Sequence, residues 1–120
     1  PKVMMVTILT SLNDADLSCM GNGNSVNEQV KKLAKLAKET NVGVVCSGHE
    51  AKFVREIIGS NLLIFTPGIR IKNDNKNDQR RVCTPAESIK NGSDKIIMGR
   101  SLIKGNILEN IDQISTSLKN

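Results

Sequence analysis

Short apolar runs rich in β-branched residues recur four times along the 120-residue chain, and amphipathic patterns lie between and after them. Each run has the length and composition of a strand that is buried on both faces. The predicted strands are residues 3–9, 42–47, 62–66 and 95–99. Strands that alternate with helices form a parallel sheet with right-handed crossovers, which predicts a doubly wound α/β sheet or part of a barrel.

Three apolar stripes at helical spacing predict the main helices. The stripes are Val30, Leu33, Ala34 and Ala37; Phe53, Val54, Ile57 and Ile58; and Leu108, Ile111, Ile114 and Leu118. Helix starts are marked by residue pairs with the spacing of a capping box. These pairs are Ser25 with Glu28, Ser47 with Glu50, Thr84 with Glu87 before Pro85, and more loosely Asn106 with Glu109.

Composition narrows the class of protein. Aromatic residues make up only 2% of the chain, with no Trp or Tyr, so aliphatic residues must build the core, which favours α/β layers over a sandwich. The formal net charge of +5 suits either nucleic acid or an anionic metabolite. Without a basic motif or interleaved aromatic residues, the metabolite is favoured, and no nucleic-acid partner is predicted.

Three widely spaced cysteines without a CxxC pair argue against a zinc site and against a disulfide scaffold. Cys46 is interpreted as a small core residue and His49 as a surface or capping residue. No catalytic set, metal site or cofactor is predicted. The longest apolar stretches are far shorter than a membrane span, and no signal-peptide pattern begins the chain, so a cytoplasmic protein without membrane contact is expected.

The residues that follow each predicted strand are candidates for ligand binding, because parallel α/β folds bind ligands at the carboxyl ends of their strands. Arg70 follows the third strand, and Gly99 with Arg100 follows the fourth. A guanidinium can hold a phosphate through two parallel hydrogen bonds, although either arginine alone could be merely solvated. The two arginines together with Gly99 favour an anion site.

Two further segments allow both a functional and a structural interpretation. Thr10 and Ser11 could bind a polar ligand edge or turn the chain towards Asn13. The polar run KNDNKNDQRR, residues 72–81, could be a solvated loop or a lid in which Gln79 or an arginine closes over phosphate.

The strings VTILTS, VVCSGHEA, FTPGIR, DQRRVCTPAESIKNGSD and IIMGR together resemble the bacterial type of orotidine 5′-monophosphate decarboxylase along essentially the whole chain. The most specific pattern is TPGIR, with Gln nine positions after its Arg and a strand-terminal Gly-Arg a further twenty on. The resemblance implies half of a (β/α)8 TIM barrel, strands five to eight. Residues 1–120 would form a single C-terminal half-barrel domain.

The resemblance also implies roles for five residues. Arg70, Gln79, Gly99 and Arg100 would grip the phosphate of a pyrimidine nucleotide (OMP or UMP), and Thr10 would read the pyrimidine edge. Ile71 and Ser101 stand where the family often has Pro.

The family's reaction, loss of CO2 from OMP to give UMP, uses Lys and Asp from a D-x-K-x-x-D motif that this chain lacks. The chain alone is therefore expected to bind a nucleotide weakly, if at all, and not to decarboxylate it. Two alternatives stay open: a non-catalytic or decayed half-barrel, and a related barrel that acts on a sugar phosphate.

A half-barrel also implies a partner. The first and last strands, 3–9 and 95–99, would present unpaired edges, which seek other strands. The missing N-terminal half or a second copy of the chain could cover them, and a homodimer could close eight strands with two-fold symmetry. Val44, Ile64 or their neighbours would then fill the interior. The alternative is an open half-barrel in looser apolar association.

Overall fold

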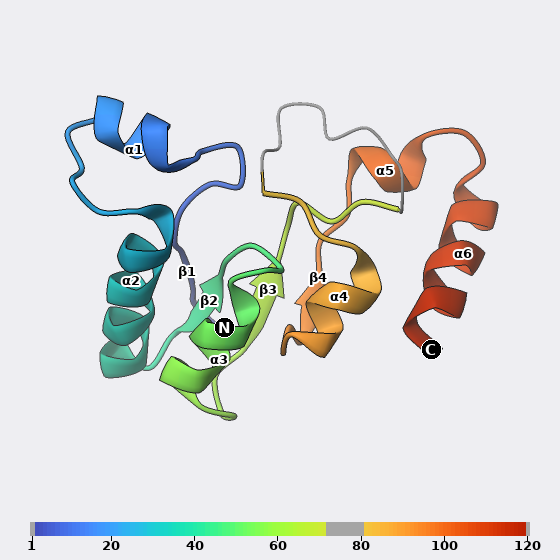
Figure 1. Cartoon of the computed structure of the whole chain (residues 1–120). Coiled ribbons are helices and arrows are strands. Elements are labelled where there is room, and N and C mark those ends of the chain that lie inside the picture. The colour runs from blue at the N-terminus through green and yellow to red at the C-terminus, as the bar shows by residue number, and fades with distance from the viewer. Residues whose placement is uncertain (1, 72–80, 120) are drawn as a thin grey trace.

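The computed structural model describes residues 2–71 and 81–119. Four strands pair in parallel, in the same order as in the sequence (Figure 1). They are β1 (Met4–Val6), β2 (Gly43–Val45), β3 (Ile64–Thr66) and β4 (Lys95–Ile96). The prediction of four consecutive parallel βα units is confirmed, although the paired strands are shorter than the apolar runs.

The two faces of the sheet differ in their environment. Val44 lies opposite Ile64 in the ladder, and both are fully buried in a core that they share with the helices. Because side chains alternate along a strand, the adjacent pair of Val45 and Phe65 faces the other side. Val6, which is paired with Val45, is 57% exposed. The expectation that Val44 and Ile64 fill the barrel interior is therefore wrong. Their neighbours Val45 and Phe65, which were the alternative, lie on the face away from the helices.

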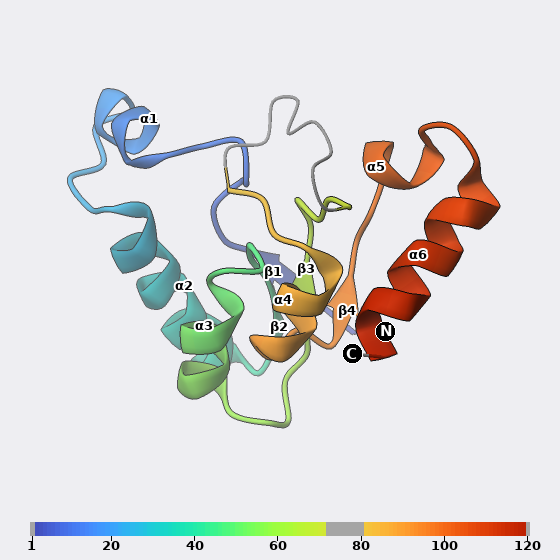
Figure 2. The ribbon, with the colours of Figure 1, turned by 45° about the vertical axis from the view of Figure 1, so that its right-hand side comes forward.

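Helices cover one face of the sheet, as Figure 2 shows for α3 and α4 in front of the strands. In chain order the helices are α1 (Asp14–Cys19), α2 (Val26–Thr40), α3 (Ala51–Ile58), α4 (Pro85–Lys90), α5 (Arg100–Ile103) and α6 (Ile107–Lys119). Helices α2 and α3 pack together, and α6 packs against α4 and α5. The short helices α1 and α5 lie at the end of the sheet where the strands finish (Figure 1).

Capping boxes begin two of the predicted helices. The Ser25 and Thr84 hydroxyls accept hydrogen bonds from the main-chain N–H groups of Glu28 and Glu87. The Glu28 and Glu87 carboxylates in turn accept hydrogen bonds from the main-chain N–H groups of Ser25 and Thr84. Asn106 Oδ1 accepts from the N–H of Glu109 at 3.3 Å at the start of α6. These local bonds satisfy N–H groups that a helix start leaves unpaired.

The box predicted from Ser47 and Glu50 forms only in part. Helix α3 begins at Ala51, and Glu50 Oε1 accepts the Ser47 N–H at 3.1 Å. The Ser47 hydroxyl is buried without a hydrogen-bond partner among the described residues. A full box that the sequence analysis did not identify joins Asn13 to Asp16 and begins α1. The Asn13 segment is therefore a helix start as well as a turn.

The third predicted stripe forms a helix but not a core. Helix α6 has no buried residue among those described, and Leu108 is 77% exposed. Ile111 and Leu118 on the same helix are exposed as well. Together with Val6, these side chains leave apolar surface on both the open face and the last helix, which is unusual for a monomeric domain.

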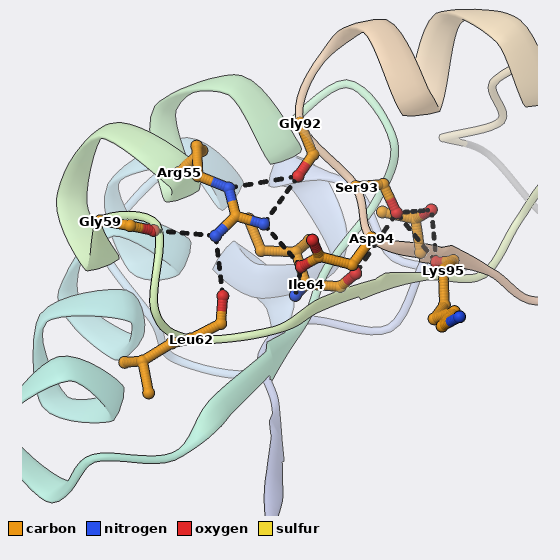
Figure 3. A network of polar contacts seen from close by, with 9 residues as sticks. Arg55, Gly59, Leu62, Ile64, Gly92, Ser93, Asp94 and Lys95 are labelled. Atoms are coloured by element: carbon orange, nitrogen blue, oxygen red, sulfur yellow. Dashed lines mark hydrogen bonds and ion pairs between the residues drawn. The ribbon is translucent and has the colours of Figure 1, made fainter.

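A polar network joins the segments that precede β3 and β4 (Figure 3). The Arg55 guanidinium donates to the carbonyls of Gly59, Leu62 and Gly92. It also pairs with Asp94 at 2.6 Å, and the same Asp94 oxygen accepts the Ile64 N–H at 2.8 Å. The network lies at the amino ends of the strands, opposite the predicted ligand site, so we assign it to stability.

No helix within residues 2–71 and 81–119 is both long and apolar enough to cross a membrane.

Candidate functional site

A cavity of about 470 Å³ opens where the strands end. Its lining includes four of the five residues predicted to bind ligand: Thr10, Arg70, Gly99 and Arg100. Val6, Val45 and Ile97 contribute an apolar part of the wall. The cavity thus combines cationic and hydroxyl groups with an apolar surface, which suits a ligand that has an anionic end and an apolar part.

Arg70 is a buried part of this wall. Its side chain and main chain together are only 6% exposed. The Arg70 N–H donates to the carbonyl of Cys83 at 3.0 Å, and Nη1 donates to the carbonyl of Ile69 at 3.0 Å. Because backbone groups hold both ends of the residue, the guanidinium has a fixed place in the cavity wall.

Gly99 and Arg100 come from the end of β4. Gly99 precedes α5, and Arg100 is the first residue of that helix. A Cβ atom built on Gly99 would meet no heavy atom within 4 Å, so the glycine faces open space. A ligand could approach the backbone closely there.

Thr10 lines the cavity and lies close to a glycine of the neighbouring segment. Gly68 has a φ of +71°, and a Cβ atom there would lie 3.3 Å from Thr10 Cβ. The positive φ and the close approach both favour glycine at this position. Thr10 itself is buried, and its carbonyl accepts the Arg81 N–H at 3.1 Å.

The two positions that depart from the expected proline pattern contact each other. The Ile71 N–H donates to Ser101 Oγ at 3.0 Å, and Ser101 is 2% exposed. Proline has no N–H at the first position and no hydroxyl at the second, so this bond requires both departures. It joins the residues that directly follow Arg70 and Arg100.

Gln79 lies outside the described residues, as do residues 72–80 of the run 72–81 that is interpreted as a lid. Of that run only Arg81 is described, and it does not line the cavity. Its guanidinium forms an ion pair with Glu50, the two side chains being 15% and 3% exposed. Sequence reasoning missed this pair, because Glu50 reads as a capping residue and Arg81 as part of a solvated loop.

Cys46 and His49 lie in different environments. Cys46 is a core residue as predicted, and burial raises the pKa of its thiol to about 12. His49 is exposed, as predicted, with Nε2 2.6 Å from the carbonyl oxygen of Val82. No group of three or more His, Cys, Asp or Glu side chains that could hold a metal ion occurs in the described parts of the chain.

Comparisons with known proteins agree on one family. The family model described as "Orotidine 5'-phosphate decarboxylase / HUMPS family" matches residues 1–109. The orotidine 5′-phosphate decarboxylase of Legionella pneumophila (strain Corby) is 44% identical over 103 residues, 85% of this chain and 45% of the relative. That of Psychromonas ingrahamii is 42% identical over 120 residues, 98% of this chain and 51% of the relative.

A solved structure extends the comparison to the fold. The crystal structure of orotidine 5′-phosphate decarboxylase from Lactobacillus acidophilus superposes with a TM-score of 0.77 at 33% identity. The superposition covers all of this chain and 50% of the Lactobacillus acidophilus chain. The chain therefore spans about half the length of the relatives that it matches.

Proposed function

The chain belongs to the orotidine 5′-phosphate decarboxylase / HUMPS family, and we propose that it is the half of such an enzyme that binds the phosphate and pyrimidine of a nucleotide. One observation carries this proposal. Thr10, Arg70, Gly99 and Arg100, which come from the ends of three different strands, line a single cavity.

The phosphate is assigned to Arg70 and Arg100 with the backbone of Gly99. Both arginines lie at the ends of neighbouring strands β3 and β4, the region where barrels commonly bind phosphate. A guanidinium offers paired donors that match phosphate oxygens. Gln79 is proposed as a further phosphate ligand from the resemblance alone.

The pyrimidine is assigned to the part of the cavity near Thr10. Its hydroxyl could bond the polar edge of the base, and Val6 and Ile97 offer apolar contact to the ring. A plain sugar phosphate would use the phosphate groups and leave this part of the cavity unfilled. Preference for a pyrimidine nucleotide over a pentose phosphate therefore separates this proposal from the sugar-phosphate alternative.

The proposed reaction of the completed barrel is decarboxylation of OMP to UMP, a cytoplasmic step of pyrimidine synthesis. This chain would contribute binding energy from the phosphate, which can stabilise a transition state remote from it. The D-x-K-x-x-D motif is absent from the 120 residues, so we assign no catalytic residue here. A half-barrel that only binds is the second candidate, favoured by that absence.

Completion of the barrel would require a partner on the open face. The exposed apolar residues at β1 and on α6, Val6 and Leu108 among them, support a partner that covers both regions. An N-terminal half-barrel fits this requirement, and a second copy of the chain is the alternative, as a homodimer.

The test is titration of the isotopically labelled chain with UMP, followed by NMR, which detects weak binding. Arg100→Ala should weaken binding roughly 10- to 150-fold, because a hydrogen bond between charged groups contributes about 1.5–3 kcal/mol. His49→Ala should have almost no effect, and Lys35→Ala on the exposed side of α2 controls for the lost charge. Equal losses in the arginine and control variants would refute the assignment.

A further inference from the structure

We propose that Arg81 is a positioning residue that holds the segment after β1, and with it Thr10, so that recognition of the base depends on Arg81 while recognition of the phosphate does not. This inference rests on the proposed function, because it presumes that Thr10 faces the base. Arg81 lies outside the cavity and needs no ligand contact for this role.

Four hydrogen bonds from Arg81 hold the segment that contains Thr10. Nη2 donates to the carbonyls of Ile8 and Leu9, each at 2.8 Å, and Nε donates to the carbonyl of Leu12 at 2.9 Å. The main-chain N–H of Arg81 donates to the carbonyl of Thr10 at 3.1 Å. The accepting carbonyls lie before, at and after Thr10, so one residue fixes the path of the chain on both sides of it.

An anchored carboxylate fixes the guanidinium in turn. Nη1 pairs with Glu50 Oε2, and Glu50 Oε1 accepts at 3.1 Å the N–H of Ser47, two residues after the end of β2. Since Glu50 is only 3% exposed, the pair is shielded from water, where the attraction between charges is stronger. The segment after β1 is thereby tied to the end of β2 through one side chain.

The proposed phosphate groups are held by different contacts. Arg70 is fixed by its main-chain bond to Cys83, and the Ile71–Ser101 bond joins the segments that follow Arg70 and Arg100. Neither contact involves the Arg81 side chain. Loss of the hydrogen bonds from the Arg81 guanidinium should therefore disturb Thr10 more than it disturbs Arg70 and Arg100.

Arg81→Lys is the variant that tests this separation. Lysine keeps the positive charge beside Glu50 but lacks the planar fork that reaches three carbonyls. The probes are UMP and ribose 5-phosphate, titrated into the whole 120-residue chain and followed by NMR. We expect Arg81→Lys to weaken UMP binding about 5- to 10-fold, the equivalent of about one hydrogen bond, and to change ribose 5-phosphate binding less than about twofold.

A double-mutant cycle with Thr10→Val gives a second readout. If Arg81 acts through Thr10, the double variant should bind UMP with the same affinity as whichever single variant binds it more weakly. The free-energy losses of two residues that act as a unit do not add. Additive losses would mean that Arg81 acts elsewhere. Should Arg81→Lys fail to fold, Glu50→Gln should give the same selective loss of UMP binding.

The outcomes separate the two proposals. Equal weakening of both ligands by Arg81→Lys, or no weakening of UMP binding, would overturn the positioning role and leave the proposed function intact. Binding of neither ligand by the unaltered chain would overturn both proposals.

Discussion

Asp94→Ala should destabilise the chain more than most single substitutions, because Asp94 Oδ2 serves two donors at once. It accepts from Arg55 Nη2 at 2.6 Å and from the Ile64 N–H at 2.8 Å (Figure 3). Alanine removes both bonds. The Ile64 N–H begins β3 in a part-buried position, so it would lose its acceptor where water reaches it poorly.

The magnitude follows from the exposure of each group. The ion pair is 23% exposed at Arg55 and 37% at Asp94, and pairs this accessible contribute under about 1 kcal/mol. An unsatisfied buried N–H costs about 1–3 kcal/mol. Arg55 keeps its bonds to the Gly59, Leu62 and Gly92 carbonyls, so no further cost arises there. The two contributions add to about 1–4 kcal/mol of unfolding free energy, with a central value of about 2.5 kcal/mol.

Urea unfolding followed by circular dichroism measures this loss. With a slope of about 1–3 kcal/mol per molar urea, a loss of about 2.5 kcal/mol should lower the midpoint by roughly 1–2.5 M. Asp94→Asn keeps an acceptor oxygen for Ile64 and should cost under about 1 kcal/mol. The exposed Asp112 on α6 supplies a control, whose change to Ala should stay within about 0.5 kcal/mol. A loss below about 0.5 kcal/mol for Asp94→Ala, or equal losses for Ala and Asn, would refute the reasoning.

Three further predictions concern thiols, acid and assembly. Burial raises the pKa of Cys46 and of Cys83 to about 12. The native chain at pH 8 should therefore react with Ellman's reagent only at the exposed Cys19, and the denatured chain at all three thiols. Rapid reaction of all three thiols in the native chain would contradict this. Hydrogen bonds from the Thr84 backbone and hydroxyl lower the pKa of Glu87. The ionised Glu87 carboxylate therefore contributes its full stability above the pKa of an unfolded Glu, and this stability is lost as pH falls through the lowered pKa of the folded chain. Urea midpoints of Glu87→Gln should therefore fall less between pH 5 and pH 3 than those of the unaltered chain, and parallel curves would count against this cap. Sedimentation at tens of micromolar should show a dimer or larger assembly, whereas a stable monomer of 13.1 kDa would mean that the apolar edges need no partner.

The sequence predicted the order of elements because strand runs and capping pairs are local signals. Ser25 and Thr84 begin helices through contacts only three residues away. The sequence could not predict which face of the sheet Val44 lies on. A strand with apolar residues on both faces shows no alternation of apolar and polar residues that would mark the face towards the helices. Helix α1, with six residues, is too short to show an apolar stripe, and only its Asn13 cap could have indicated it.

The site was predictable to the extent that one rule of parallel sheets governs it. Arg70 and Arg100 lie at a common cavity because strands that run in parallel end at the same edge. The Arg81–Glu50 pair and the Ile71–Ser101 bond follow no such rule, because each joins two segments that are distant in the sequence. Contacts of this kind depend on tertiary packing, which periodicity and spacing do not describe.

The most direct test of the proposed function mixes the purified chain with OMP and follows the ligand by proton NMR. Saturation transferred from the protein to the ligand reports binding, and the appearance of the second pyrimidine proton of UMP reports decarboxylation. We predict transfer to the ligand, reduced in Arg100→Ala, and no UMP from the chain alone. Formation of UMP by a preparation freed of host enzyme, or no transfer at millimolar ligand, would contradict the assignment of this chain as a binding half without the catalytic residues.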